Sequence, residues 1–253
     1  GLRVGTEPSL FSCAQAQTDS SARTGKIEHV PAEILESRLM KLAIIDYGSG
    51  NLRSAQKAFE RASHEAGLNA TIELTNEPEI VAAADRIVLP GVGAFGDCMD
   101  GLTALPGMVE ALNEVVHKNG RPFLGICVGM QLLANESYEN GKHKGLGWIE
   151  GSIKKLYGPN LKLPHMGWNN VEVRKNFPKM IFSIENKDFY FVHSYFVGAK
   201  SCLSTVGITQ YGLDIAAAIA RDNIFAVQFH PEKSHRDGLQ LLDNFMQWDG
   251  NYS

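Results

Sequence analysis

One residue of this sequence, Cys127, has the type and the neighbours that predict nucleophilic chemistry. It lies between Gly125 and Gly129, after an apolar strand predicted over residues 122–126 and before a helix predicted over residues 128–135. Strand, tight turn and helix form the nucleophile elbow of the GxSxG motif, here with cysteine in place of serine. The start of a helix offers partial positive charge and free N–H groups, which favour a thiolate. A buried structural cysteine is the alternative, and it leaves the two glycines without a reason.

A histidine and a carboxylate follow a second buried strand near the end of the chain. Residues 224–229 are largely apolar and run into His230, Pro231 and Glu232. Pro231 favours extended backbone at His230, and side chains two residues apart in an extended chain point the same way. A histidine can take the proton of a nearby cysteine, and a carboxylate can hold the imidazole in the required tautomer. These residues could alone end a strand, but together with Cys127 they predict a nucleophile, a base and an orienting group.

Alternating strand and helix patterns must bring these residues together. Strands are predicted over residues 42–45, 71–74, 86–89 and 122–126, and helices over residues 52–62, 77–84 and 97–118. Such alternation indicates parallel βαβ units with helices on both faces of a sheet. After about Gly145, antiparallel strands are predicted at one edge, over residues 147–156, 170–173, 189–197, 202–209 and 215–220, before the strand at 224–229 and a helix at 238–248. We therefore predict an α/β fold with a central, mostly parallel sheet, flanking helices and added antiparallel strands.

The composition restricts the class of protein. Hydrophobic residues make up 44% and charged residues 21% of the 253 residues, which is ordinary for a soluble globular protein. The net charge of -4 gives no reason to expect nucleic acid or an anionic membrane as a partner. Four widely spaced cysteines, without a CxxC pair, argue against a disulfide framework and a zinc site, and predict a reducing compartment, the cytoplasm. No metal and no organic cofactor is indicated.

The first 39 residues differ from the rest of the chain. They lack a sustained apolar period and a continuous apolar segment of the kind found in secretory signals. Met40, followed by an apolar segment, resembles a natural start. We interpret residues 1–39 as a leader, a tag or a disordered arm, and residues 40–253 as one domain.

Five motifs in order carry a family resemblance. The segments around Cys127 and His230, extended to Gln131 and to Lys233-Ser234, are similar to those of the class I glutamine amidotransferases. Three further segments indicate one group within that class, the glutaminase subunits of imidazole glycerol phosphate synthase from histidine biosynthesis: Asp46–Leu52, Leu89–Phe95 and Pro164–Asn169. The resemblance extends from Met40 to about Trp248.

The resemblance implies a reaction and a set of site residues. Cys127 would attack the side-chain amide of glutamine, His230 would move the proton, Glu232 would orient His230, and water would release glutamate from the thioester. The oxyanion hole would be formed by Val92, Gly93 and Val128, and the substrate would be held by Gly93, Gln131, Glu139, His193, Ser194 and Tyr195. Glu139 lies in a polar segment, and a solvated surface acid is the alternative reading of it.

The resemblance also implies a partner. Ammonia would pass to a separate (β/α)₈-barrel cyclase subunit, which forms imidazole glycerol phosphate and an aminoimidazole carboxamide ribotide, so the enzyme would be a heterodimer. Asn51, Trp168 and Lys233 would lie on the partner face. Pro164 and Gly167 indicate a loop that exposes Trp168, and a core position for Trp168 is the alternative.

Other functions remain open on the sequence alone. The segments Asp46–Leu52 and Pro164–Asn169 count against a role in pyridoxal phosphate or anthranilate synthesis, but a surface-sugar paralogue could keep every motif. Intact Cys127, His230 and Glu232 count against a non-catalytic scaffold, and an independent cysteine hydrolase acting on esters or peptides is a further alternative. The segment Pro90-Gly91-Val92-Gly93 suggests a control point, because glycines on both sides of Val92 let its peptide unit rotate. A rigid turn with a preformed oxyanion hole is the alternative.

Overall fold

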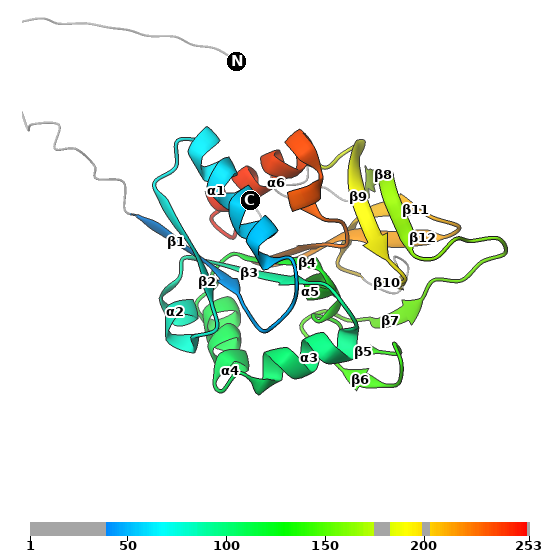
Figure 1. The fold of residues 1–253 in the computed structure, drawn as a ribbon, viewed down its shortest axis with the longest axis horizontal. Coiled ribbons are helices and arrows are strands. Elements are labelled where there is room, and N and C mark those ends of the chain that lie inside the picture. The colour runs from blue at the N-terminus through cyan, green and yellow to red at the C-terminus, as the bar shows by residue number, and fades with distance from the viewer. Residues whose placement is uncertain (1–38, 175–182, 199–202, 252–253) are drawn as a thin grey trace, which may run out of the picture. The chain divides into compact units, whose positions relative to one another are not determined.

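A nine-stranded sheet and a smaller four-stranded sheet organise the chain (Figure 1). The computed structural model describes residues 39–174, 183–198 and 203–251. The predicted leader, except for Leu39, lies outside the described residues, and so does Cys202 at the start of one predicted strand.

Five parallel strands form one half of the large sheet, and four of them are the strands that the sequence predicts in parallel βαβ units. In spatial order they are β2 (Ala70–Thr75), β1 (Met40–Ile45), β3 (Arg86–Gly91), β4 (Phe123–Cys127) and β13 (Ile224–Val227). Every residue of β4 and β13 is buried. Parallel strands with helices on both faces require such continuous apolar sequence, because neither side meets water.

The other half of the large sheet is antiparallel and continues from β13. Its strands are β12 (Asp214–Arg221), β11 (Thr205–Gln210), β8 (His165–Val173) and β9 (Lys187–His193). This confirms the predicted antiparallel addition at one edge.

Two segments predicted at that edge do not join it, so the prediction was wrong for residues 147–156 and for the end of 189–197. They supply β7 (Ser152–Lys155) and β10 (Tyr195–Val197) of the second sheet, which also contains β5 (Glu136–Ser137) and β6 (His143–Lys144) from a segment that was not predicted as strand. The single strand predicted over residues 189–197 is divided at Ser194, whose carbonyl accepts a hydrogen bond from the Leu156 amide. Beyond this point the chain pairs with β7 instead of β8.

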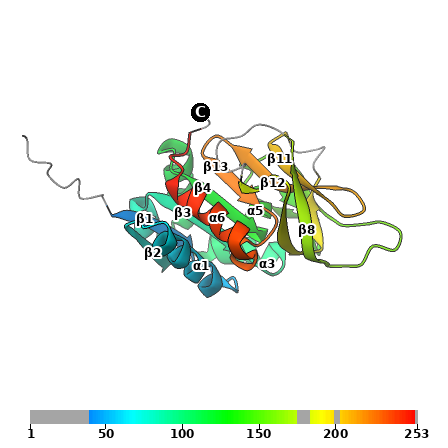
Figure 2. The same cartoon turned by 90° about the horizontal axis from the view of Figure 1, so that it is seen from above.

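Helices cover both faces of the parallel strands. Figure 1 shows α1 (Leu52–Glu65) and α6 (His235–Gln247) on one face, with α2 (Pro78–Ala83), α3 (Phe95–Ala104) and α4 (Met108–Asn113) on the other. A π-helical turn, η1 (Glu114–Lys118), extends α4. From above, α1 and α6 lie side by side across the sheet (Figure 2). Among the described residues, no helix is long and apolar enough to cross a membrane.

Two helices are shorter than predicted. The helix expected over residues 97–118 is broken between α3 and α4, where Gly107 has a φ of 76° directly after Pro106. The helix expected over residues 128–135 ends early, as α5 (Val128–Gln131). The carbonyls of Leu132 and Ala134 accept hydrogen bonds from the amides of residues 146 and 147, so the backbone turns instead of continuing as a helix.

Candidate active site

Cys127 occupies a strained turn between β4 and α5. Its φ of 54° and ψ of -110° are unusual for a residue with a side chain. The flanking glycines are required by packing. A Cβ on Gly129 would collide with the carbonyl oxygen of Leu89 in β3, and one on Gly125 would lie 3.0 Å from the Cβ of Ala226 in β13. The turn therefore lies against both neighbouring strands, which presents the sulfur at the end of the sheet.

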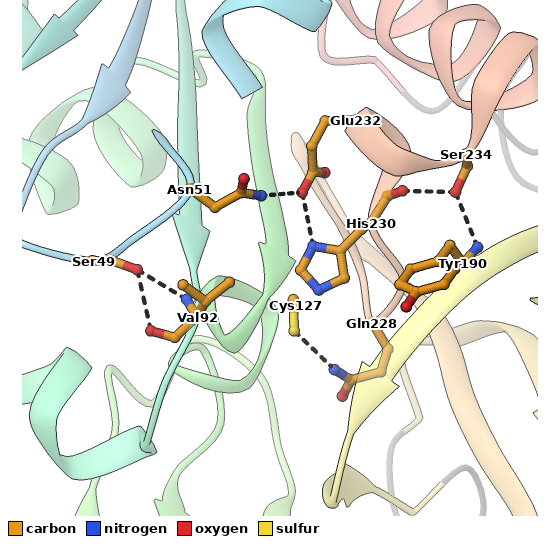
Figure 3. A network of polar contacts seen from close by, with 9 residues as sticks. All are labelled: Ser49, Asn51, Val92, Cys127, Tyr190, Gln228, His230, Glu232 and Ser234. Atoms are coloured by element: carbon orange, nitrogen blue, oxygen red, sulfur yellow. Dashed lines mark hydrogen bonds and ion pairs between the residues drawn. The ribbon is translucent and has the colours of Figure 1, made fainter. Parts of the chain in front are cut away.

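His230 and Glu232 reach the same end of the sheet from β13. Strands β4 and β13 are parallel neighbours that pair Ile126 with Val227, so the segments that follow them begin side by side. Glu232 lies in the 3-10 turn η3 (Pro231–Lys233), and its Oε1 is 2.8 Å from His230 Nδ1. Figure 3 shows the imidazole between Glu232 and Cys127. His230 Nε2 is buried, points towards the sulfur, and makes no hydrogen bond to the described residues.

The surroundings of His230 favour its charged form. Burial lowers the pKa of His230, but the neighbouring Cys127 and the hydrogen-bonded Glu232 together raise it more, to about 10. An imidazolium beside the sulfur favours a thiolate there. The geometry and the charges therefore suit a cysteine nucleophile with a histidine that can donate a proton.

Asn51 holds the carboxylate in position. Its Nδ2 donates a hydrogen bond of 2.8 Å to Glu232 Oε1, the same oxygen that contacts His230. Asn51 has a left-handed backbone conformation, with a φ of 67°, and precedes α1. Sequence reasoning placed Asn51 only on a partner face. An asparagine after a glycine turn is a visible signal, but it does not reveal a contact with a residue 181 positions away.

A cavity of about 440 Å³ opens at this end of the sheet. Two predicted site residues, Trp168 and Glu232, do not line the cavity, and Glu232 lies behind His230. All the other predicted site residues line it: Asn51, Val92, Gly93, Cys127, Val128, Gln131, Glu139, His193, Ser194, Tyr195, His230 and Lys233. Among the described residues, no group of three or more His, Cys, Asp and Glu side chains is arranged to hold a metal ion.

Gln131 and Glu139 present acceptors to the cavity. Gln131 Nε2 donates to the carbonyl of Tyr195 and to Gln228 Oε1, each at 3.0 Å, so both of its hydrogens are used. Only its oxygen remains to bind a ligand. Glu139 is half-buried, and its Oε2 accepts a hydrogen bond of 2.8 Å from the amide of Phe95, at the start of α3. An amide oxygen and a carboxylate suit an ammonium group.

The predicted oxyanion hole is incomplete in this structure. The Val92 amide donates to Ser49 Oγ at 2.9 Å, so that N–H is already engaged. The Val92 carbonyl accepts hydrogen bonds from Ser49 Oγ at 3.4 Å and from Cys98 Sγ at 3.5 Å. Val128, by contrast, is the first residue of α5, where amide groups have no partner within a helix. Of the three predicted residues, Val128 thus lies at a helix start, and Val92 is held by Ser49, which sequence reasoning did not single out.

A buried histidine pair supports the wall of the cavity, and sequence reasoning missed its partner, His165. His193 Nδ1 is 2.8 Å from the Tyr195 carbonyl and must donate to it, so His193 Nε2 accepts from His165 Nδ1 at 3.0 Å. Asn169 Nδ2 then donates to His165 Nε2 at 3.2 Å. Burial lowers the pKa of His165 to about 4 and that of His193 to about 3. Both rings are therefore neutral at pH 7, with their tautomers fixed.

Trp168 is 48% exposed and is not a core residue. The loop predicted around it is a strand, because β8 begins at His165 and pairs Trp168 with Tyr190 in β9. The indole stacks on His235, with ring centroids 5.0 Å apart. Lys233 is exposed, and its Nζ lies 5.9 Å from the ring centroid of Tyr190. Trp168 and Lys233 therefore lie near each other on an accessible surface beside η3.

Comparisons with known proteins agree with this fold. The profile of the family described as glutamine amidotransferase class-I matches residues 43–248. A crystal structure of a glutamine amidotransferase superposes with a TM-score of 0.61 at 16% identity, covering 82% of this chain and 99% of the other. A glutamine amidotransferase from Thermotoga maritima gives a TM-score of 0.54 at 16% identity, covering 83% and 91%. The chain belongs to the class I glutamine amidotransferases.

Curated relatives narrow the group. The chain is 53% identical over 216 residues to the imidazole glycerol phosphate synthase subunit HisH of Brucella suis, covering 83% of this chain and 99% of that protein. Identity to the HisH subunit of Agrobacterium fabrum is 53% over 214 residues, and to that of Rhodospirillum rubrum 50% over 212 residues, with the same coverage. Within its class, the chain is therefore a member of the HisH group.

Proposed function

We propose that this chain hydrolyses glutamine through Cys127, His230 and Glu232 and supplies the ammonia to a cyclase subunit in histidine biosynthesis. The observation that carries the proposal is the imidazole held by Glu232 at 2.8 Å, with its second nitrogen turned to the sulfur at the wall of a cavity. Membership of the HisH group supports the choice of synthase and pathway over pyridoxal phosphate, anthranilate or surface-sugar synthesis.

The geometry supports a thioester mechanism. The Cys127 thiolate attacks the side-chain carbonyl carbon of glutamine, and charge develops on the carbonyl oxygen. His230 Nε2 gives its proton to the amide nitrogen, the C–N bond breaks, and ammonia leaves. Water then attacks the thioester while His230 accepts one of its protons, and the C–S bond breaks to release glutamate. The thiolate and the imidazolium are regenerated, so one water is consumed for each glutamine.

The cavity supports binding of the amino-acid end of glutamine away from the sulfur. The free oxygen of Gln131 and the carboxylate of Glu139 suit the α-ammonium group. The segment His193–Tyr195 lines the same wall and would hold the α-carboxylate through backbone groups. Different elements would then bind the α-ammonium and the α-carboxylate of glutamine, so an amide that lacks either charged group would bind poorly.

We propose a heterodimer in which a (β/α)₈-barrel subunit covers the surface around Trp168 and Lys233 and receives the ammonia. An exposed indole beside an exposed lysine suits a partner that offers an apolar pocket and a carboxylate. Lys233 directly follows Glu232, so a partner bound there would also lie beside the cavity. Asn51, which lines the cavity as well, would connect that surface to the carboxylate.

We further propose that the isolated chain is held in a slow state. Because the Val92 N–H is bonded to Ser49, it must rotate to complete the oxyanion hole. One such donor is worth about 10²–10³ in rate, so we expect the ligand-loaded complex to be at least about a hundredfold faster.

We propose the cytoplasm as the site of action, because the reaction needs Cys127 as a free thiol, and Cys98 and Cys127 are both free. Residues 40–253 would form the catalytic domain, with residues 1–39 dispensable for it.

Glutamate release by the wild type and Cys127→Ala tests the function. The variant should lose glutamine hydrolysis but should still support the cyclase reaction when ammonium salts are added, since ammonia chemistry does not need the thiol. Ammonium-dependent turnover is the internal control for folding and assembly. A generic ester as substrate separates this function from that of an independent cysteine hydrolase. Wild-type glutaminase activity in Cys127→Ala would refute the proposal, and activity with esters alone would favour the hydrolase.

A further inference from the structure

A buried amide lies against the nucleophile on the side away from Glu232. Gln228 follows β13 two residues before His230, and its side chain is fully buried. Its Nε2 lies 3.7 Å from Cys127 Sγ, within hydrogen-bonding range for sulfur (Figure 3). The predicted mechanism gives this residue no role.

The orientation of the Gln228 amide follows from its neighbours. The Tyr195 carbonyl can only accept a hydrogen bond, so Gln131 must turn its Nε2 towards it. The same Nε2 is 3.0 Å from the Gln228 side chain, which must therefore present its oxygen. That leaves the Gln228 NH₂ group directed at Cys127 Sγ, as an N–H donor and not as an acceptor. A main-chain carbonyl thus fixes both amides.

The sulfur then lies between the imidazole of His230 and the amide of Gln228, and these two groups act differently. His230 carries a proton that moves during the reaction, whereas an amide N–H of Gln228 cannot be given up. A donor of this kind interacts more strongly with a thiolate than with a thiol, because the acceptor is charged. It therefore favours the thiolate before attack and again when sulfur leaves the thioester.

We infer that Gln228 holds Cys127 Sγ as a thiolate in its attacking position, and that Gln131 keeps the Gln228 amide turned the right way. The inference rests on the proposed function, since it assumes that Cys127 is the nucleophile. It also gives Gln131 a second task besides contact with the substrate. An ammonium group bound to the Gln131 oxygen would then also affect the Gln228 amide, which contacts Cys127 Sγ.

Alkylation of Cys127 by iodoacetamide, followed by mass spectrometry of the Cys127 peptide, tests the inference without substrate or partner. The full chain is compared with Gln228→Met, which keeps the length but removes the donor, and with Gln228→Glu, which replaces the donor with a carboxylate. Gln56→Met is the matched control, because that half-buried amide donates to the Ile72 carbonyl instead.

The expected result is a change in pH dependence. The pH midpoint of the alkylation rate should rise by about one pH unit in Gln228→Met, because the charged sulfur loses the N–H donor of Gln228. It should rise further in Gln228→Glu, which puts a carboxylate in place of that donor. The plateau rate above the midpoint should stay at the wild-type value, which a loss of structure around the sulfur would not allow. Gln56→Met should match the wild type.

Midpoints equal to the wild type in both Gln228 variants would overturn the inference and leave the assignment of Cys127 intact. If Gln228→Met fails to fold, Gln131→Met provides the second test, because Gln228 then stays in place without its anchor and the midpoint should rise by less. An unchanged midpoint in Gln131→Met would overturn the role given to Gln131. A wild-type Cys127 that resists alkylation at every pH would refute the proposed function itself.

Discussion

Removing the Ser49 hydroxyl should make the isolated chain a faster glutaminase. Ser49 Oγ accepts the N–H of Val92 at 2.9 Å and donates to the carbonyl of the same residue at 3.4 Å. Both bonds hold the peptide in an orientation in which the N–H is not available to the proposed oxyanion. Ser49→Ala deletes both hydrogen bonds and leaves the sequence of the Pro90–Gly93 turn unchanged.

The size of the effect follows from one hydrogen bond. A neutral hydrogen bond contributes about 0.5–1.5 kcal/mol net, and the longer Ser49 contact adds little to it. At about 1.4 kcal/mol for each factor of ten, rotation of the peptide should become about two- to tenfold more frequent. The contact from Cys98 Sγ to the Val92 carbonyl remains and keeps the gain modest.

Glutamate release by the free chain, at saturating glutamine and without a cyclase subunit, is the assay. Ser54→Ala is the control, since Ser54 is an exposed serine in the first turn of α1. We expect the rate of Ser49→Ala to rise, and the further acceleration by a ligand-loaded partner to shrink by the same factor. A rate for Ser49→Ala at or below that of the wild type would show that Ser49 does not restrain the loop.

Because Cys127 and Glu232 hold the pKa of His230 at about 10 against burial, Cys127→Ala should lower that pKa in an NMR titration. This pKa lies above the unfolded value of 6.5, so protonated His230 stabilises the folded chain fully below pH 6.5, and this stabilisation is lost as the pH rises through about 10. Equal pH dependence of the melting temperature in wild type and Cys127→Ala would contradict this. Trp168→Ala and Lys233→Ala should weaken binding to the cyclase subunit in titration calorimetry without lowering the melting temperature, and unchanged affinity in both would move the interface elsewhere. Deletion of residues 1–39 should leave the melting temperature nearly unchanged, and a fall of many degrees would show that this segment is structural.

The parts of the fold that depend on local sequence could be predicted. Strands β4 and β13 are continuous apolar segments, and the turn at Cys127 is marked by two glycines, of which Gly129 leaves no room for a side chain. The prediction of one helix over residues 97–118 missed the break between α3 and α4, although Pro106 and Gly107 are a strong turn signal inside a helical pattern. The apolar residues after α5 led to the wrong prediction of a helix to residue 135, because the pattern of Leu132 and Leu133 fits a helix as well as a buried turn.

The polar contacts that complete the site could not be predicted. Ser49, Asn51 and Gln228 act through hydrogen bonds to residues 43, 181 and 101 positions away. Such contacts depend on which strands become neighbours, and amide or hydroxyl side chains carry no periodic signal that reveals a distant partner. His165 was hidden for the same reason, because its environment is made by β9 and by Tyr211.

The adjacency of β4 and β13 has a consequence for inhibition. Neighbouring strands lie about 4.8 Å apart, so the sheet itself brings the segments that carry the proposed nucleophile and its proposed base side by side. The loop proposed to complete the oxyanion hole follows β3, on the other side of β4, and its Val92 peptide is held by a contact with Ser49. An electrophilic drug aimed at the sulfur would therefore consume idle and working enzyme alike. A compound that binds only one orientation of the Val92 peptide would instead distinguish idle from working enzyme, and could inhibit only the enzyme engaged in synthesis.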